Sequence, residues 1–385
     1  MGSLIRSVVG SLTRIMRVNA MLATHDLPPE SLPWMEEVRD IFDELVIFID
    51  AKRAAPGAAT RAENVGSRVH YHKADTWYEW DLGSMAQTCK SDWVFIIERD
   101  EQLSPEWRQP QWREILKSTD LTHFWIPRRW VVPGGRYITA APWWPDFQLR
   151  LVRNNIPGTT FPTRLHDTAH VPGPGGHLST LAIHHHVLWL CSRATREERV
   201  RYYEQLRPGG ALGHYYLYED HAPPQARLPK PFQLDAAREV IRMEQLPPEQ
   251  VSKISLEVSA VPREVPVSTM FWVDAQVTNA AKKTLYPVAP YPVCLAYHWI
   301  EKTTRQMVVF DGHRSGLFPG LQAKSTSRYP MKIVAPKEPG KYILQTTMVQ
   351  DGVCWFEQIR PGIIQEFPVS IVASPHGGSW RERQS

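Results

Sequence analysis

The residues Trp93-Val94-Phe95-Ile96-Ile97, followed by Glu98-Arg99-Asp100-Glu101, form the stretch that indicates the fold most directly. A short, continuous apolar run of this kind is typical of a strand buried on both faces. Similar runs at 18–23, 45–49 and 68–72 precede it, and apolar residues at helical spacing in 29–45 and 82–89 separate them. Strands that alternate with helices predict a parallel sheet with right-handed crossovers. Ligands bind beyond the carboxyl ends of such strands, where Asp50 and Asp100 lie.

The sequence changes character after residue 221. Residues 222–251 are rich in proline and predict a linker that contains a helix. Short alternating runs separated by Pro, Gly and Asn then predict an antiparallel β-sandwich. We therefore expect five parts: an N-terminal extension (1–17), an α/β domain (18–221), a helical linker (222–251), an all-β, immunoglobulin-like sandwich (252–375) and a disordered tail (376–385).

The expected sandwich has three segments that combine aromatic and polar residues. They are Tyr297-His298-Trp299, Asp311-Gly312-His313-Arg314-Ser315 and Gly352-Val353-Cys354-Trp355-Phe356. Such residues could form a carbohydrate-binding face. Large aromatic side chains also fill the interior of sandwiches, and we expect Trp299 and Trp355 in the core.

Composition excludes several classes of protein. A chain of 385 residues predicts two domains, and 44 basic against 40 acidic residues leave a net charge of +4, too small for a nucleic-acid binder. Four cysteines lie far apart without CxxC spacing, which favours a reducing cytoplasm. No apolar run approaches the roughly 20 residues that cross a bilayer. These features predict a soluble, cytoplasmic protein.

The first 17 residues leave two alternatives open. Apolar residues in 4–17 recur at helical spacing with arginines on other faces, so this segment could lie on the inner face of a membrane. The other interpretation is an ordinary amphipathic or frayed extension. A cleavable signal peptide fits less well, because basic residues run through the apolar stretch.

The acidic residues after the strand at 93–97 are the strongest chemical signal. Carboxylates such as Glu98 and Asp100 can hold Mg²⁺ or Mn²⁺, which prefer oxygen ligands. Such an ion would bridge the phosphates of a nucleotide-sugar and offset the charge on the departing diphosphate. The alternative is a solvated turn without function.

Over about its first 220 residues the sequence resembles the family 2 glycosyltransferases, which are inverting enzymes of GT-A (Rossmann-like) fold. Asp50 matches the family's Asp at the end of the second strand, which contacts the nucleotide base. Glu98-Arg99-Asp100-Glu101-Gln102-Leu103-Ser104 is similar to the family's DxD motif, with Glu98 where Asp is usual. The resemblance implies that Asp100 binds the metal and that Glu98 faces the ribose or water around the ion. The departure at Glu98 puts strict metal dependence and the choice of donor in doubt.

A second matching segment is Trp143-Trp144-Pro145-Asp146-Phe147-Gln148-Leu149-Arg150-Leu151. It looks like the segment in which bacterial lipopolysaccharide-core sugar transferases place an aromatic acceptor wall and an arginine. The resemblance implies substrate contacts by Trp143, Trp144 and Arg150. The alternative is that both tryptophans are core residues.

Two further groups complete the expected site. In the resembling family an acidic pair at the position of His166-Asp167 lies beside the reacting sugar, so Asp167 is the candidate general base and His166 a substrate contact. A solvated surface Asp is the alternative. His184 and His185 resemble the family's late histidine element and would complete the Mn²⁺ shell. A structural zinc site fits less well, because no Cys or suitably spaced His partner is present.

These expectations lead to three hypotheses about function. The first is an inverting transferase that moves a hexose from a nucleotide-diphosphate sugar, most simply a UDP-sugar, to a glycan or lipid-linked acceptor with Mn²⁺ or Mg²⁺. The second is a transferase-like protein without activity that binds glycans or acts as a scaffold. The third is a hydrolase with paired carboxylates flanking a glycosidic bond.

Overall fold

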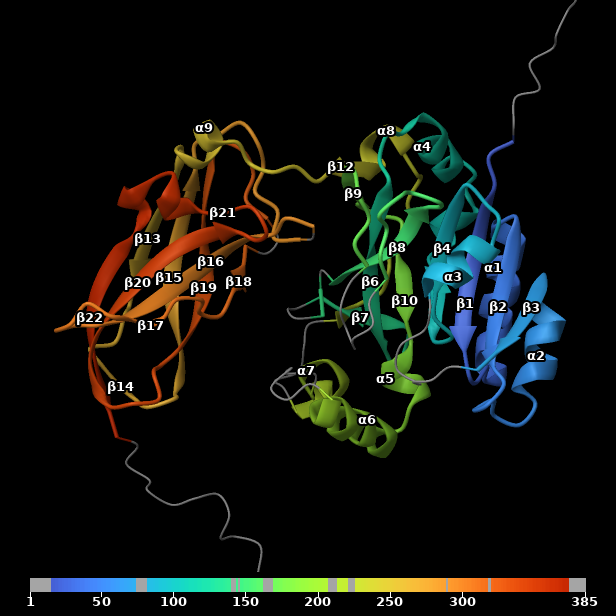
Figure 1. Cartoon of the computed structure of the whole chain (residues 1–385), viewed down its shortest axis with the longest axis horizontal. Helices are drawn as coiled ribbons and strands as arrows, with labels where there is room; N and C mark the ends of the chain where they lie inside the picture. Colours follow the sequence, from blue (N-terminus) through green and yellow to red (C-terminus); the bar gives the residue numbers. More distant parts are fainter. Residues whose placement is uncertain are drawn as a thin grey trace, which may run out of the picture. The chain divides into compact units, whose positions relative to one another are not determined.

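The computed structural model describes residues 15–73, 82–139, 143–144, 146–161, 169–206, 213–220, 226–288, 290–317 and 320–373. The chain divides into two compact units, Met1–Arg242 (unit 1) and Met243–Ser385 (unit 2) (Figure 1). Most of the amphipathic segment expected at 4–17 lies outside the described residues. In the described part of the chain, no helix combines the length and the apolar character that crossing a bilayer requires.

Unit 1 begins with the alternation of strands and helices that the sequence predicts. Its first elements are β1 (Val18–Thr24), η1 (Pro29–Ser31), α1 (Leu32–Ile41), β2 (Glu44–Asp50), α2 (Ala58–Val65), β3 (Arg68–His72), α3 (Leu82–Thr88) and β4 (Trp93–Ile97). The later elements are β5 (Glu101–Leu103), η2 (Pro105–Arg108), α4 (Trp112–Ser118), β6 (His123–Val132), β7 (Arg136–Ile138), β8 (Asp146–Arg153), β9 (Gly175–Leu178), β10 (Ile183–His185), α5 (Val187–Leu190), α6 (Arg193–Leu206), α7 (Gly213–Tyr216), η3 (Tyr218–Asp220), β11 (Ala226–Arg227), α8 (Ala236–Glu239) and β12 (Val240–Arg242).

These strands form one 12-stranded mixed sheet, whose main order is β11-β7-β6-β8-β4-β1-β2-β3. Strands β4, β1, β2 and β3 are parallel. Their apolar residues alternate between two cores on opposite faces of the sheet: Leu45, Ile47 and Ile49 of β2 enter one core, and Val46 and Phe48 enter the other. Burial on both faces explains why these strands read as continuous apolar runs.

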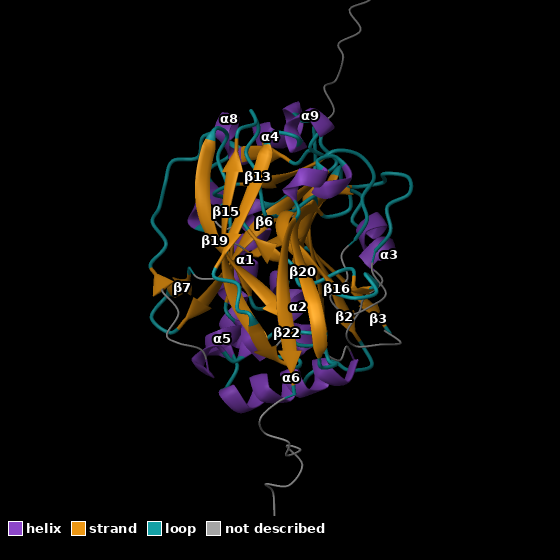
Figure 2. Cartoon of the chain, turned by 90° about the vertical axis from the view of Figure 1, so that its left-hand side faces the viewer, coloured by secondary structure: helices purple, strands orange, loops and turns teal. Residues whose placement is uncertain are grey.

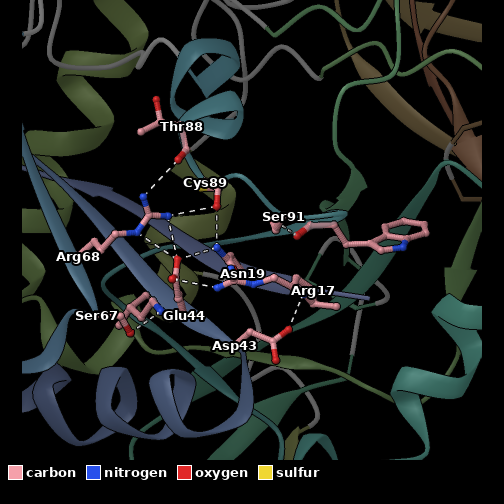
Figure 3. A network of polar contacts seen from close by, with 12 residues as sticks. Arg17, Asn19, Asp43, Glu44, Ser67, Arg68, Thr88, Cys89 and Ser91 are labelled. Carbon is pink, nitrogen blue, oxygen red and sulfur yellow. Dashed lines mark hydrogen bonds and ion pairs between the residues drawn. The ribbon is translucent and has the colours of Figure 1, made fainter. Parts of the chain in front are cut away.

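A polar network ties the amino ends of the parallel strands together (Figure 3). Glu44, the first residue of β2, accepts hydrogen bonds from Asn19 Nδ2 of β1 at 2.9 Å and from Arg68 Nη2 of β3 at 2.8 Å. The carbonyl of Cys89 accepts from the same two side chains, at 2.7 Å from Asn19 Nδ2 and 3.1 Å from Arg68 Nη2. Arg17 Nη2 also donates to Glu44, at 2.9 Å. The network therefore links strands that are distant in the sequence.

Replacing Asn19 by alanine is expected to lower the free energy of unfolding of unit 1 by about 1–3 kcal/mol, because the fully buried amide donates two hydrogen bonds that no other group replaces. Urea unfolding followed by far-UV circular dichroism measures this loss. The matched control is Asn64→Ala, at an exposed position of α2, which is expected to stay within about 0.5 kcal/mol of the parent. Equal effects of the two substitutions would contradict the role of the network.

Unit 2 contains a three-stranded and a seven-stranded sheet, with orders β13-β15-β19 and β14-β22-β20-β16-β17; β18 and β21 pair with β16 and β20. Both sheets contribute to one core, in which Trp299 is fully buried and donates from Nε1 to the Val334 carbonyl at 2.9 Å. The elements are α9 (Pro248–Val251), β13 (Ile254–Ser259), β14 (Glu264–Pro266), β15 (Met270–Asn279), β16 (Val293–Glu301), β17 (Met307–Val309), β18 (Ser315–Gly316), β19 (Ser325–Val334), β20 (Gly340–Gln350), β21 (Cys354–Trp355), η4 (Phe356–Gln358), η5 (Pro361–Ile363) and β22 (Gln365–Val372).

The predicted fold class, an α/β GT-A (Rossmann-like) domain with a separate immunoglobulin-like sandwich, is wrong. The described residues form 22 strands and nine α-helices, and four of these helices span only four residues, so the protein is mostly β (Figure 2). The alternation of strands and helices ends with β4. Beyond it, β8 pairs antiparallel with both β4 and β6, and large mixed sheets replace a helix-covered parallel sheet.

The segment expected as a linker, 222–251, is divided between the two units. Its described residues in unit 1 include β11 and β12, which pair with β7 and β9. These strands have only two and three residues, which are too few to show a period of two in the sequence. The proline-rich composition therefore predicted a linker instead.

Candidate functional site

Polar residues follow three neighbouring parallel strands of unit 1 at the same edge of the sheet. His25 and Asp26 follow β1, Asp50 ends β2, and Glu98 to Asp100 follow β4. An ion pair joins the turns that follow β1 and β4: Arg99 Nη1 lies 2.6 Å from Asp26 Oδ2. Burial, with Arg99 next in importance, lowers the pKa of His25. Asp50 and Asp100 therefore follow the two strands that flank β1, at the same edge of the sheet.

Asp50 is fully buried, and its carboxylate oxygens accept hydrogen bonds within its own turn. Oδ1 accepts from the backbone N–H of Lys52 at 3.0 Å, and Oδ2 accepts from Arg53 Nη1 at 2.8 Å. The expected base-binding carboxylate is therefore fixed in position by its neighbours.

Glu98 and Glu101 are held by one buried arginine. Arg150 Nη2, from β8, donates to Glu98 Oε1 at 2.5 Å and to Glu101 Oε1 at 2.6 Å. Glu101 is fully buried, whereas 49% of the Glu98 side chain is exposed. The expected substrate contact Arg150 thus belongs to an internal ion-pair network, and Glu98 retains an exposed side next to Asp100.

Asp100 lies against His185, the last residue of β10. His185 stands opposite Glu101 in the antiparallel pair of β10 and β5, and the backbone N–H of His186 donates to the Asp100 carbonyl at 2.8 Å. These contacts bring Asp100 Oδ1 within 3.6 Å of His185 Nδ1. The distance is too long for a hydrogen bond but short enough for both groups to contact one ligand.

The imidazole of His185 is buried at 3% exposure, and neither ring nitrogen forms a hydrogen bond with any described residue. Burial, followed by the charge of Arg128, lowers the pKa of His185 well below its ordinary value, so the ring is neutral at pH 7. A buried polar atom without a partner costs about 1–3 kcal/mol. Two such atoms beside a carboxylate can both serve as ligand-binding atoms.

His184 does not join Asp100. Successive residues of a strand point to opposite faces, and His184 Nε2 lies 3.1 Å from Arg129 Nη1. Burial, with Arg129 next in importance, lowers the pKa of His184 to about 3, so its neutral ring accepts from the guanidinium. Of the two histidines expected at the metal, the structure brings only His185 to Asp100.

The two expected acceptor tryptophans have different environments. Trp143 is buried at 3% exposure in a small core, and its Nε1 donates to the Tyr215 carbonyl at 3.0 Å. Trp144 is half-buried, with its ring 5.4 Å from that of Tyr137 and 6.0 Å from the Arg129 guanidinium. His166 and the candidate base Asp167 lie outside the described residues.

Two arginines whose charges act on His185, Arg128 and Arg199, were not among the expected site residues. Arg199 of α6 is half-buried, its charge acts favourably on Asp100, and its guanidinium lies 5.6 Å from the Tyr216 ring. It makes no hydrogen bond or ion pair with the residues the structure describes. Arg128 of β6 pairs with Asp146, whose Oδ2 accepts from Nε at 2.7 Å. The sequence contained a signal for Arg128: two consecutive arginines lie inside an otherwise apolar strand, where a buried charge needs a partner.

Within the described ranges, no group of three or more His, Cys, Asp or Glu side chains is arranged to hold a metal ion. Asp100 and His185 therefore offer two ligands at most. The helices α5 and α6, which follow β10 directly in the chain, lie beyond the end of that strand and border the same edge (Figure 1).

Comparison with known proteins adds little to this site. No protein-family model and no curated protein matches the chain. A mutant β-glucosidase from Listeria innocua in complex with laminaribiose is similar over 32% of this chain and 16% of its own, at 13% identity and a TM-score of 0.23. A CARDB domain from Pyrococcus furiosus, in complex with di-metal ions, is similar over 31% of this chain and 94% of its own, at 15% identity and a TM-score of 0.21. These scores are too low to support a functional argument.

Proposed function

We propose that unit 1 transfers a hexose from a nucleotide-diphosphate sugar to a hydroxyl group of a glycan or lipid-linked acceptor, with inversion at the anomeric carbon. The observation that carries this proposal is the buried imidazole of His185, with two unpartnered nitrogens beside Asp100. The proposal depends on the chemistry of this edge of the sheet and not on the fold class, which differs from the expected one.

The residues at this edge fit a divalent cation that the substrate helps to bind. A carboxylate oxygen from Asp100 and a neutral imidazole nitrogen from His185 are both ligands that Mn²⁺ accepts. Two protein ligands are enough where substrate phosphates and water supply the others, as is common for Mg²⁺. When bound, the ion would offset the charge that grows on the departing diphosphate.

The protein's own residues would bind and orient the donor. Arg199 offers N–H donors, and a planar guanidinium suits phosphate oxygens. By the family resemblance, Asp50 at the end of β2 would contact the nucleotide base. By the family resemblance, Asp167 would take the proton from the acceptor hydroxyl as its oxygen attacks the anomeric carbon opposite the diphosphate.

A screen of UDP-, GDP- and dTDP-sugars with and without Mn²⁺ tests the proposal. One donor is expected to raise the unfolding temperature only when Mn²⁺ is present, because a ligand at 100 times its dissociation constant stabilises the folded state by about 2.7 kcal/mol. For a unit of this size, each kcal/mol corresponds to about 2–4 °C. The same donor, incubated with acceptor glycans, is expected to give a product in which the anomeric configuration is inverted.

The variant Asp100→Asn is expected to abolish the Mn²⁺-dependent shift and the transfer. The matched control is Asp40→Asn, whose parent side chain is 71% exposed on α1, and it is expected to keep both. The proposal fails if no donor shifts the unfolding temperature at millimolar concentration. Release of free sugar from donor without acceptor at the rate of transfer would indicate a hydrolase instead.

A non-catalytic, glycan-binding role is the second candidate. The observation that favours it is the ion pair of Glu98 with Arg150, which engages one of the two expected metal-site carboxylates internally. A protein of this kind would bind glycans without any metal-linked affinity for nucleotides, so the same screen distinguishes the two functions.

A further inference from the structure

Three segments that are separated in the sequence meet on the outer face of the seven-stranded sheet of unit 2. Tyr297 and Trp299 of β16 face the core, so the alternation of the strand turns His298 to the other face. The His298 ring stacks on that of Phe310 at 5.0 Å, and Trp355 of β21 lies 4.6 Å from His298 and 5.1 Å from Phe310. We call His298, Phe310 and Trp355 the aromatic platform.

Buried hydrogen bonds hold the aromatic platform in place. His298 is 2% exposed, with Nε2 3.2 Å from Glu357 Oε1 and Nδ1 bonded to the Phe310 carbonyl. The second carboxylate oxygen of Glu357 accepts from the buried Thr347 hydroxyl at 2.6 Å. The loop that carries Phe310 is thus tied to the sheet, and a ligand that binds there loses little free energy in ordering the protein.

Two members of the aromatic platform, Phe310 and Trp355, reach the surface above the buried His298, and polar side chains form a rim around them. Phe310 is 55% exposed, and Trp355 is half-buried. The Arg314 guanidinium lies 4.6 Å from the Trp355 ring and pairs with Asp351 at 2.9 Å and with Asp311 at 2.6 Å. The rim therefore combines fixed donors and acceptors around an apolar centre.

We propose that the aromatic platform is a binding site for a neutral oligosaccharide. A pyranose ring has an apolar C–H face, which packs on an aromatic ring, and a border of hydroxyls that both donate and accept hydrogen bonds. The rim of Arg314 with two aspartates matches such a border. An anionic ligand fits less well, because the two carboxylates outnumber the single guanidinium.

A peptide ligand that adds a strand to the seven-stranded sheet does not suit the edge formed by β17. The edge strand β17 has three residues, and its pairing with β16 shifts register between Trp299 and Ile300. Strand addition requires a longer regular edge. The proposed glycan site is also independent of the transfer site, because every residue that forms it belongs to unit 2.

Native affinity electrophoresis of the full chain in gels that contain laminarin, xylan, galactomannan or dextran tests the proposal. At least one of these neutral polysaccharides is expected to retard the protein. The variants Phe310→Ala and Trp355→Ala are expected to weaken retardation by at least about tenfold, the effect of removing an aromatic side chain at the centre of a binding site. Phe310→Tyr keeps an aromatic ring and is expected to keep binding.

The matched control is Trp272→Ala, which removes a 56% exposed tryptophan from the other sheet of unit 2 and is expected to leave retardation unchanged. Asp100→Asn is also expected to leave it unchanged, which separates this test from that of the transfer site. Thermal unfolding of each variant shows whether it folds. The proposal is overturned if no polysaccharide retards the parent, if Phe310→Ala binds like the parent, or if the platform instead mediates a dimer that Phe310→Ala dissociates in sedimentation experiments.

Discussion

Replacing Arg150 by methionine is expected to destabilise unit 1 by about 3–5 kcal/mol, because it leaves the fully buried Glu101 without its closest cation. Burial raises the pKa of Glu101 to about 7 against the opposing charge of Arg150. The experiment is therefore a urea unfolding series at pH 8, where the carboxylate is ionised in the parent protein and in the unfolded chain. The double variant Arg150→Met/Glu101→Gln is expected to recover part of the loss, because it no longer buries an unpaired charge.

The control for this prediction is an exposed ion pair of the same unit. Lys117 and Glu114 are 54% and 64% exposed, and Lys117→Met is expected to cost no more than about 0.5 kcal/mol. A loss below about 1 kcal/mol for Arg150→Met would show that Glu101 is neutral in the folded state, and the double variant would then gain nothing.

Acidification from pH 7 to pH 5 is expected to destabilise unit 1 steeply. Burial lowers the pKa of His123, His177 and His186 to about 4 and that of His184 to about 3. In the unfolded chain each titrates near 6.5. Above about pH 6.5 the rings are neutral in both states, and their contribution to the free energy of unfolding is fully present. Below this pH the rings of the unfolded chain gain protons, whereas the buried rings of the folded chain stay neutral. Each histidine therefore lowers the free energy of unfolding by about 2 kcal/mol at pH 5.

The free energy of unfolding, measured in urea at pH 5, 6, 7 and 8, tests this expectation. His123→Gln is expected to reduce the slope of the free energy of unfolding against pH below pH 6.5 by the contribution of one proton, because the substituted side chain does not titrate. A free energy that stays constant between pH 7 and pH 5 would show that these rings gain protons without unfolding.

The sequence predicted the first four strands and the sheet edge at which Asp50 and Asp100 lie. The strands expected at 18–23, 45–49, 68–72 and 93–97 lie where β1 to β4 are found, because strands buried on both faces are continuously apolar. The later strands carry different residues. β6 contains Pro127 with two arginines and β9 begins with two glycines, so neither shows an apolar run, and the fold class was extrapolated wrongly from the first hundred residues.

Which residues meet in the candidate site depends on the register of the paired strands, and no local sequence pattern reveals that register. Three consecutive histidines are equivalent in the sequence, and pairing of β10 with β5 decides that His185 and not His184 meets Asp100. The engagement of Arg150 with Glu98 and Glu101 depends in the same way on the pairing of β8 with β4. Residue types were therefore predictable, whereas their partners were not.

The position of β10 has a consequence for synthesis of the chain. This three-residue strand pairs with both β5 and β6, yet it begins at Ile183, 80 residues after β5 ends at Leu103 (183 − 103). At about 5–20 residues per second, a ribosome needs roughly 4 to 16 seconds to add this stretch. During that interval β5 lacks β10, the strand with which it pairs in the folded sheet. A product that terminates before residue 183 lacks His185 and cannot complete the pair with Asp100.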